Sequence, residues 1–205
     1  DQYDIYLHTT SWGQTGWIHD DNEEREWIDN ALHKTVKYNQ QGGQYDMSLQ
    51  ITIPNEWKKI APINVGYTAG IETTAVAPQW IEKSREMDRI IVVSNHSKEV
   101  FENTKYGIMD QQTKQQTGVA QVEIPIIAIN YPVKDIEPVD LGLELSTDFN
   151  FVCVAQWGPR KNVQNTLNWF IQEFHDDEDV GLVLKVFHMN TSNMDRVFVL
   201  KQLAG

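Results

Sequence analysis

Cysteine and basic side chains are scarce in this sequence, and each shortage excludes a class of protein. Only one cysteine, Cys153, occurs among the 205 residues, so the chain cannot form an internal disulfide or a thiolate zinc cluster by itself. Lys and Arg number 17 against 29 Asp and Glu, which gives a net charge of −12. Because nucleic-acid binding depends on clustered Lys and Arg, no nucleic-acid partner is expected.

Long apolar runs are missing as well. No stretch approaches the roughly 20 apolar residues of a membrane-spanning helix, and no charged segment followed by an apolar one opens the chain. We therefore expect a soluble, cytoplasmic protein with no transmembrane segment. Hydrophobic residues still make up 40% of the sequence, which is enough to predict a folded core.

Several chemical motifs are also absent. The six histidines show no metal-ligand spacing and no HExxH pattern, so no metal and no cofactor are expected. No Gly-x-Gly-x-x-Gly follows a strand, and no Walker lysine motif or nucleophile elbow occurs. These absences disfavour nicotinamide dehydrogenases, P-loop ATPases and serine hydrolases.

Apolar runs alternating with helical patterns predict an α/β fold, with a Rossmann-like parallel sheet flanked by helices. The run RIIVV is almost uninterrupted, which is typical of a parallel strand covered by helices on both faces. The run at 122–130 is broken by Pro125, which favours a strand at an edge or one that leads into a crossover. Asn22 is predicted to cap one helix and either Ser94 or Asn95 another, and a third helix is expected around Trp80. The expected strands are residues 3–9, 46–53, 63–68, 89–93 and 122–130.

Two polar stretches are predicted to lie outside these elements. Residues 102–121 are rich in Gln, Lys and Thr and are expected to form a mobile surface loop. Residues 132–148 carry prolines, glycines and acidic side chains typical of a linker. Beyond them the alternation restarts with the strand FNFVCVAQ, in which Cys153 is expected to be buried. We therefore predict an N-terminal Rossmann-like domain at 1–133, a linker at 134–148 and the start of an incomplete second domain at 149–205. Position 1 is not Met, and the chain is expected to be a fragment.

In open parallel sheets the ligand lies at the carboxyl ends of the strands, so the loops after strands carry the candidates. The sharpest is the turn Trp157 to Asn162, where Arg160 and Lys161 precede a helix that Asn162 can cap. A helix amino end beside two cations suits a diphosphate, and the alternative is an ordinary solvated turn. The diphosphate candidates are Gly158, Arg160, Lys161 and Asn162. The other loops are Thr10 to Gly16, Pro54 to Trp57, Thr68 to Glu72 and Ser94 to Lys98.

The loop Thr68 to Glu72 combines small residues with a carboxylate. Glu72 is the candidate catalytic base, and the alternative is a solvent-facing Glu in the first turn of a helix. His96 is a candidate donor to a phosphate, with capping or surface exposure as the alternative. The residues expected to line the cleft are Thr68, Gly70, Ser94 and His96.

The seven tryptophans fall into two groups. Trp27, Trp80 and Trp169 lie on predicted helical faces and are expected in the core. The others lie in or beside loops that follow strands, where a ring either stacks on a sugar or base or packs between loop and helix. These are Trp12, Trp17, Trp57 and Trp157.

Three stretches carry a resemblance to a known family. NVGYTAGIETTAVAPQWIEKSREMDRIIVVSNHSKEVFENT, the segment ending INYPV, and FNFVCVAQWGPRKNVQNTLNWFIQEF resemble glycosyltransferases of the GT-B architecture, group-1 type. The "S..SK..F" and "PRKN" elements recur in that family. The resemblance spans most of residues 64–174.

The resemblance implies two Rossmann-like domains facing across a cleft. It implies that the first binds mainly the acceptor and the second a nucleotide-diphosphate sugar, with no obligatory metal. Lys161 matches the family lysine that contacts the diphosphate. The family arginine is Gln156 here, with Arg160 as its replacement, and Ser94 and Ser97 match the cleft loop.

Two family features have no clear match in the sequence. Only Gly13 and Gly16 stand where the Gly-rich loop of the family is expected. The acidic pair that binds the donor is expected beyond residue 205. Two alternatives to the glycosyltransferase therefore stay open, a noncatalytic Rossmann-like binding or assembly module and a nucleotide-sugar epimerase of the same architecture.

Overall fold

The computed structural model describes residues 3–10, 21–189 and 192–204. It divides the chain into two compact units, unit 1 from Asp1 to Lys134 and unit 2 from Asp135 to Gly205. Each unit contains its own parallel sheet. None of the helices in the described ranges combines the length and apolar character that crossing a bilayer demands.

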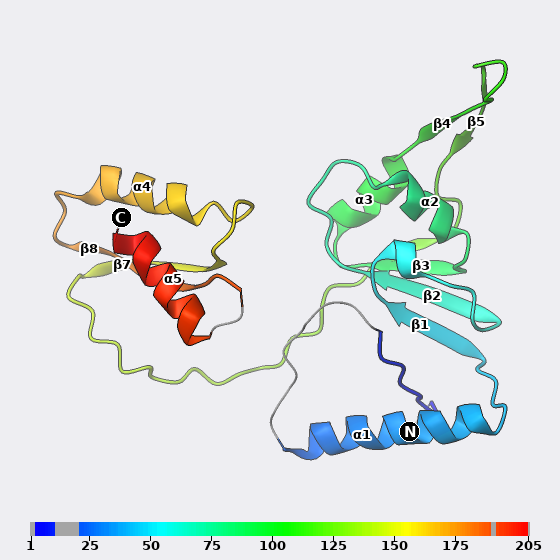
Figure 1. Ribbon diagram of the computed structural model, residues 1–205, viewed down its shortest axis with the longest axis horizontal. Helices are drawn as coiled ribbons and strands as arrows, with labels where there is room; N and C mark the ends of the chain where they lie inside the picture. Colours follow the sequence, from blue (N-terminus) through cyan, green and yellow to red (C-terminus); the bar gives the residue numbers. More distant parts are fainter. Residues whose placement is uncertain (1–2, 11–20, 190–191, 205) are drawn as a thin grey trace. The chain divides into compact units, whose positions relative to one another are not determined.

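Unit 1 is built on a four-stranded parallel sheet, which confirms the expected α/β class (Figure 1). Its strands lie in the order β1-β2-β3-β6. Because Pro125 directly precedes β6 and cannot donate a ladder hydrogen bond, an edge position suits this strand, as predicted. The strands are β1 (Met47–Ile51), β2 (Ile63–Thr68), β3 (Arg89–Val92) and β6 (Ile126–Ala128).

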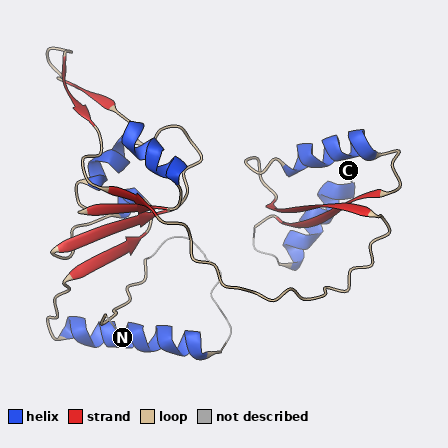
Figure 2. Cartoon of the chain, turned by 180° about the vertical axis from the view of Figure 1, so that it is seen from behind, coloured by secondary structure: helices blue, strands red, loops and turns tan. Residues whose placement is uncertain are grey.

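One face of this sheet holds the core of unit 1. Figures 1 and 2 show α2 (Pro78–Ser84) and α3 (Asn95–Asn103) lying over that face. Trp57, just after the short 3-10 helix Pro54–Glu56, is fully buried there, so packing rather than stacking on a ligand explains this ring. Trp80 packs against the same core. The buried apolar set is Trp57, Val76, Ile81, Met87, Ile90, Val92, Val100, Phe101 and Ile126.

The opposite face of the sheet departs from the expectation of helices on both sides. Leu49 and Ile51 of β1 and Ile63 of β2 are each more than half exposed. The register places these residues on one side, because Met47 pairs with Ile63 and Ile51 pairs with Tyr67. The apolar run therefore predicted the strands correctly. The expectation that helices cover both faces of the sheet was wrong for this face.

The segment at residues 3–10 forms no strand, so the first predicted strand is wrong. Its backbone bonds to helix α1 (Glu23–Gln40) instead of to β1, since the Leu7 N–H donates to the Thr35 hydroxyl at 2.9 Å. The predicted cap of α1 is confirmed, because the Asn22 side chain accepts the Arg25 N–H. Trp27 is 52% exposed, so its expected place in the core is wrong.

Residues 102–121 are not a structureless loop. They contain the antiparallel pair β4 (Tyr106–Met109) and β5 (Gln116–Ala120), the ribbon at the upper right of Figure 1. The Asp110 carboxylate accepts the N–H groups of Gln112 and Thr113 and so fixes the turn. These hydrogen bonds hold the pKa of Asp110 below its usual value, the Thr113 N–H contributing most. The prediction of a mobile loop from the polar composition was wrong, because local hydrogen bonds stabilise a hairpin.

Residues 129–145, which span the boundary between the units, carry no helix or strand, and the predicted linker at 134–148 stays a prediction. Unit 2 pairs β7 (Phe149–Gln156) with β8 (Val180–Phe187) in parallel, and its helices are α4 (Val163–Phe174) and α5 (Asn193–Ala204). Phe151 contacts Phe170 and Phe174 of α4, and Cys153 is half-buried rather than buried. Trp169 is 61% exposed, so its expected core position is wrong.

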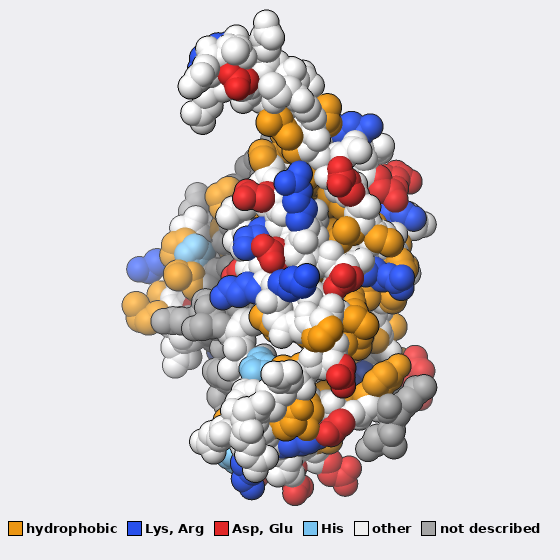
Figure 3. Space-filling model, turned by 90° about the vertical axis from the view of Figure 1, so that its right-hand side faces the viewer, with side chains coloured by type: hydrophobic (Ala, Val, Ile, Leu, Met, Phe, Trp, Pro, Cys, Tyr) orange, Lys and Arg blue, Asp and Glu red, His pale blue; other side chains and the backbone are white. Residues whose placement is uncertain are grey.

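Charged side chains of both signs lie on the face drawn in Figure 3. On the face drawn in Figure 3, Lys and Arg side chains lie among Asp and Glu side chains, with apolar groups between them.

Candidate functional site

The structure brings two of the predicted loops together at the carboxyl ends of β2 and β3. The Ile71 N–H donates to the Ser97 hydroxyl at 3.2 Å, which ties the loop after β2 to the first turn of α3. A Cβ placed on Gly70 would lie 3.4 Å from a methyl group of Val93, so the two loops are in contact there as well. This is the edge of a parallel sheet at which ligands bind in open α/β folds.

Ser94 and His96 belong to this edge but differ in what their side chains do. The Ser94 hydroxyl accepts the Ser97 N–H at 3.1 Å and lies 3.0 Å from the Ser97 hydroxyl, so Ser94, one of the two predicted caps, is the cap of α3. His96 is exposed in the first turn of α3. Ser94 therefore stabilises the start of α3. The cleft roles of Ser94 and His96 stay predictions.

Thr68 ends β2 and is almost fully buried, at 2% exposure. Its hydroxyl and the Trp57 indole N–H are the two buried side-chain polar atoms in the described ranges that have no hydrogen-bond partner. Glu72 lies exposed in the loop before α2, so it does not belong to a first helical turn. Its catalytic role stays a prediction.

A pocket of about 320 Å³ opens at the ends of β1 and β2. Thr68 is the one predicted cleft residue in its lining, and Gly70, Glu72, Ser94 and His96 are not part of it. The Thr52 hydroxyl donates to the Glu56 carboxylate inside this set, and the Tyr67 and Tyr131 rings meet edge to face, 6.1 Å between centroids. The lining residues are Ile51, Thr52, Ile53, Glu56, Tyr67, Thr68, Ala69 and Tyr131.

Most of this lining was not predicted as part of the site. Glu56 lies in the loop Pro54 to Trp57, which follows β1. Because ligands in open parallel sheets bind near the loops that follow strands, the position of this loop could have identified Glu56. Thr52 immediately precedes that loop. Tyr131 lies far away in sequence, just after β6, and reaches the pocket because β6 is parallel to the other strands.

The second candidate site is the turn between β7 and α4 in unit 2. The N–H groups of Lys161 and Asn162 both donate to the Gly158 carbonyl at 3.1 Å, which closes the turn. Arg160, Lys161 and Asn162 are exposed, and Gly158 is half-buried. The structure therefore brings all four predicted diphosphate residues to one corner.

Asn162 occupies the cap position of α4 without capping it. Its backbone is left-handed, with φ 53° and ψ 37°, and its side-chain oxygen accepts from the Asn165 amide at 2.8 Å instead of from a backbone N–H. The predicted capping bond is therefore wrong, because a left-handed backbone does not adopt the extended geometry that capping requires. The first N–H groups of α4 are consequently not bonded by the Asn162 side chain.

A further cluster at the carboxyl end of β8 lies beside this corner. The Trp157 N–H donates to the Phe187 carbonyl at 2.6 Å, and Gln156 donates to the His188 carbonyl at 2.9 Å. The carboxylate of Asp195 in α5 accepts the backbone N–H groups of His188 at 2.7 Å and Met189 at 2.6 Å. The Gln156 side chain thus links the ends of β7 and β8.

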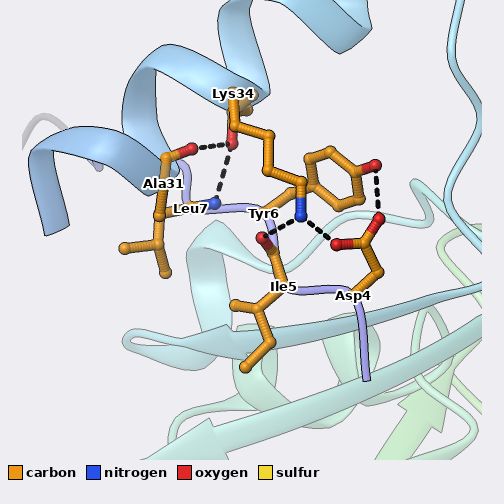
Figure 4. Close-up of polar contacts among 7 residues, drawn as sticks. Asp4, Ile5, Tyr6, Leu7, Ala31 and Lys34 are labelled. Atoms are coloured by element: carbon orange, nitrogen blue, oxygen red, sulfur yellow. Dashed lines mark hydrogen bonds and ion pairs between the residues drawn. The ribbon is translucent and has the colours of Figure 1, made fainter. Parts of the chain in front are cut away.

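The segment before α1 forms a separate polar cluster, drawn in Figure 4. The Lys34 ammonium donates to Asp4 and lies 4.4 Å from the centre of the Tyr6 ring, and Tyr6 donates to the same carboxylate. Lys34, and then Tyr6, hold the pKa of Asp4 below its usual value. The hydrogen bond to Asp4, with burial second, raises the pKa of Tyr6 to about 12.

Across residues 3–10, 21–189 and 192–204, no three His, Cys, Asp or Glu side chains are grouped so as to hold a metal ion. Gly13, Gly16, Trp12 and Trp17 lie outside the described residues. Comparison of the chain with protein-family models, with curated proteins and with solved structures gives no match.

Proposed function

We propose that the chain acts as a glycosyltransferase of the GT-B type, taking a sugar from a nucleotide-diphosphate donor. The observation that carries the proposal is the state of Lys161. Its ammonium is exposed at the opening of α4, and within the described part of the chain it makes no hydrogen bond or ion pair. In a chain of net charge −12, Lys161 adjoins a second cation, Arg160, in the turn that follows β7.

The surroundings of Lys161 suit a diphosphate. The amino end of α4 carries the positive end of the helix dipole, and Asn162 leaves its first N–H groups without a side-chain acceptor. Backbone N–H groups and a lysine together would neutralise the charge that develops on a leaving nucleoside diphosphate. Arg160 adds a second positive charge to the same turn.

Unit 1 supplies the other half of the proposal. Thr68, Gly70, Ser94 and His96 gather at the carboxyl ends of β2 and β3, where a parallel sheet offers its binding edge. In this proposal they line the acceptor side, with Glu72 as the base that takes the acceptor proton.

The test is the affinity of the full chain for nucleoside diphosphates. Uridine, guanosine, adenosine and thymidine diphosphates are titrated separately by calorimetry. Lys161→Ala should lose a charge-assisted hydrogen bond of about 1.5 to 3 kcal/mol, roughly a tenfold to hundredfold weaker binding. Lys201→Ala removes the same charge from an exposed position in α5 and should leave the affinity unchanged.

The outcomes separate the alternatives. Binding that Lys161→Ala weakens and Lys201→Ala does not supports the donor role. Equal affinities for the parent and Lys161→Ala, or no binding of any of the four diphosphates, would reject it and favour the noncatalytic module. A nucleotide sugar that is interconverted without an acceptor would favour the epimerase.

A further inference from the structure

We infer that the pocket between helix α1 and residues 3–5 binds one pyranose ring of an uncharged saccharide. This pocket has a volume of about 400 Å³, which lies within the usual range for small-molecule sites. It shares no lining residue with the pocket at the ends of β1 and β2. Because its walls come only from residues 3–5 and from α1, the inference does not rest on the proposed function.

Hydrogen bonds hold the two walls of this pocket together. The Lys34 ammonium, on α1, donates to the Asp4 carboxylate and to the Ile5 carbonyl, the latter at 3.4 Å (Figure 4). Two residues further along the segment, the Leu7 N–H donates to the Thr35 hydroxyl of α1. Since the walls are already linked without a ligand, a ligand that binds between them has little ordering to impose on the chain.

An exposed aromatic ring lines each wall of the pocket. Trp27 belongs to α1 and is 52% exposed, and Tyr3 belongs to the segment and is 68% exposed. Trp27 and Ala31 are four residues apart and lie on the same side of the helix, so the small Ala31 side chain leaves space next to the indole. A pyranose has a face of C–H groups that stacks on an exposed ring, and burial of this face would drive binding.

Polar groups beside these rings suit the hydroxyl groups of a sugar. The Trp27 indole N–H, the Tyr3 hydroxyl and the Asn30 amide form no hydrogen bond with other residues in the ranges that the structure describes. The Asn30 amide can both donate and accept, which matches a sugar hydroxyl. Because the hydroxyls of a pyranose surround its ring, one sugar can stack on the indole and form these hydrogen bonds at the same time.

The charges at the pocket disfavour an anionic ligand. Lys34 is the one basic residue that the described part of the chain contributes to the lining, and its ammonium already donates to Asp4. Glu23, Glu24 and Glu26 lie in the first turn of α1, directly before the tryptophan of the pocket. A phosphate or carboxylate on the ligand would meet these like charges. We therefore expect an uncharged sugar rather than a nucleotide or a sugar acid.

The test follows the indole N–H signal of Trp27 in the ¹⁵N-labelled full chain, with no nucleotide present. The signal is identified by its loss in Trp27→Phe. The probes are the methyl glycosides of glucose, galactose, mannose and N-acetylglucosamine, titrated separately. We expect at least one of them to shift the Trp27 signal to saturation at millimolar concentration, and the 6-phosphate of the same sugar to bind more weakly.

Two pairs of variants sharpen the test. Trp27→Ala should abolish binding, followed by the backbone amide signal of Lys34, whereas Trp169→Ala removes an exposed indole from α4 and should leave binding intact. Asn30→Ala removes the amide from an exposed position of α1 and should weaken binding about two- to tenfold. His33→Ala changes an exposed position of the same helix outside the lining and should leave the affinity unchanged.

The contrary results are distinct. If none of the four glycosides shifts the Trp27 signal, or if binding survives Trp27→Ala, the pocket is not a saccharide site. A 6-phosphate that binds as tightly as its uncharged sugar would overturn the exclusion of anions, and unchanged affinity in Asn30→Ala would remove the amide from the site. Adenosine represents the competing class of ligand, and saturation by adenosine at lower concentration than by any glycoside would replace the saccharide with a nucleoside. Because no diphosphate is present, these results do not depend on the donor site in unit 2.

Discussion

Replacing Gly66 with alanine should destabilise unit 1 through a collision with Trp57. A Cβ at position 66 would lie 2.5 Å from Cε2 and 2.6 Å from Cζ2 of the indole, where ordinary contacts begin near 3.4 Å. The ring would have to retreat by roughly 1 Å, yet Trp57 is fully buried and cannot move into solvent. Overpacking of this kind costs about 1 to 3 kcal/mol.

Gly70→Ala is the matched control for this prediction. Its new Cβ would meet only Val93, at 3.4 Å, and the residue is exposed. The free energy of unfolding should therefore stay within about 0.5 kcal/mol of the parent. Urea denaturation of the full chain, followed by the amide signals of unit 1, measures both variants.

A double-mutant cycle isolates the collision. In a Trp57→Leu background the indole is gone, so adding Gly66→Ala should cost less than it does in the parent. If Gly66→Ala proves no more destabilising than Gly70→Ala, or if its cost is the same with and without the indole, the packing described for β2 is wrong.

Two further predictions concern the loop before α4 and the cluster before α1. Asn162→Ala should cost about 1 kcal/mol in unfolding free energy because its backbone is left-handed, whereas Asn162→Gly should cost less; equal costs would argue against that backbone. The raised pKa of Tyr6 favours its neutral form in the folded state, so its contribution to stability is complete below about pH 10 and is lost as the pH rises through about 12. A ¹³C-tyrosine titration should show Tyr6 ionising near 12 in the parent and nearer 10 in Asp4→Asn, and a Tyr6 that titrates with ordinary tyrosines in the parent would contradict the hydrogen bond.

The parts of the fold that sequence predicted correctly have local causes. The apolar run RIIVV and the run at 63–68 formed β3 and β2, and the caps Asn22 and Ser94 formed as expected. A buried strand and a capping side chain are determined by residues close together in the chain. These features can therefore be predicted from the sequence alone.

The elements that were predicted wrongly depend on contacts between residues far apart in the sequence or on hydrogen bonds within a turn. The pattern of residues 3–9 is typical of a strand, but the Leu7 N–H donates to the Thr35 hydroxyl of α1 instead of to a neighbouring strand. The β4–β5 hairpin depends on Asp110 and on the Tyr106 hydroxyl, which donates to the Val76 carbonyl at 2.6 Å across 30 residues. Composition alone carried no signal for either contact.

The candidate sites were predictable to different degrees. Arg160 and Lys161 follow a clear strand, so their place at its carboxyl end could be predicted from order alone. The pocket combines residues 51–56 with 67–69 and Tyr131, and such a set depends on sheet register rather than on a motif. The preference of Asn for helix caps predicted a capping bond from Asn162. The residue instead adopts a left-handed backbone in which its side chain does not cap α4.

The most direct test of the donor role is to map nucleoside diphosphate binding on the amide spectrum of the full chain. We predict that saturating ligand moves the backbone N–H signals of residues 158–165, with the largest shifts in the first turn of α4. Lys161→Ala should reduce these shifts at equal ligand concentration. Shifts confined to other parts of the chain, or a spectrum that does not change at millimolar ligand, would contradict it.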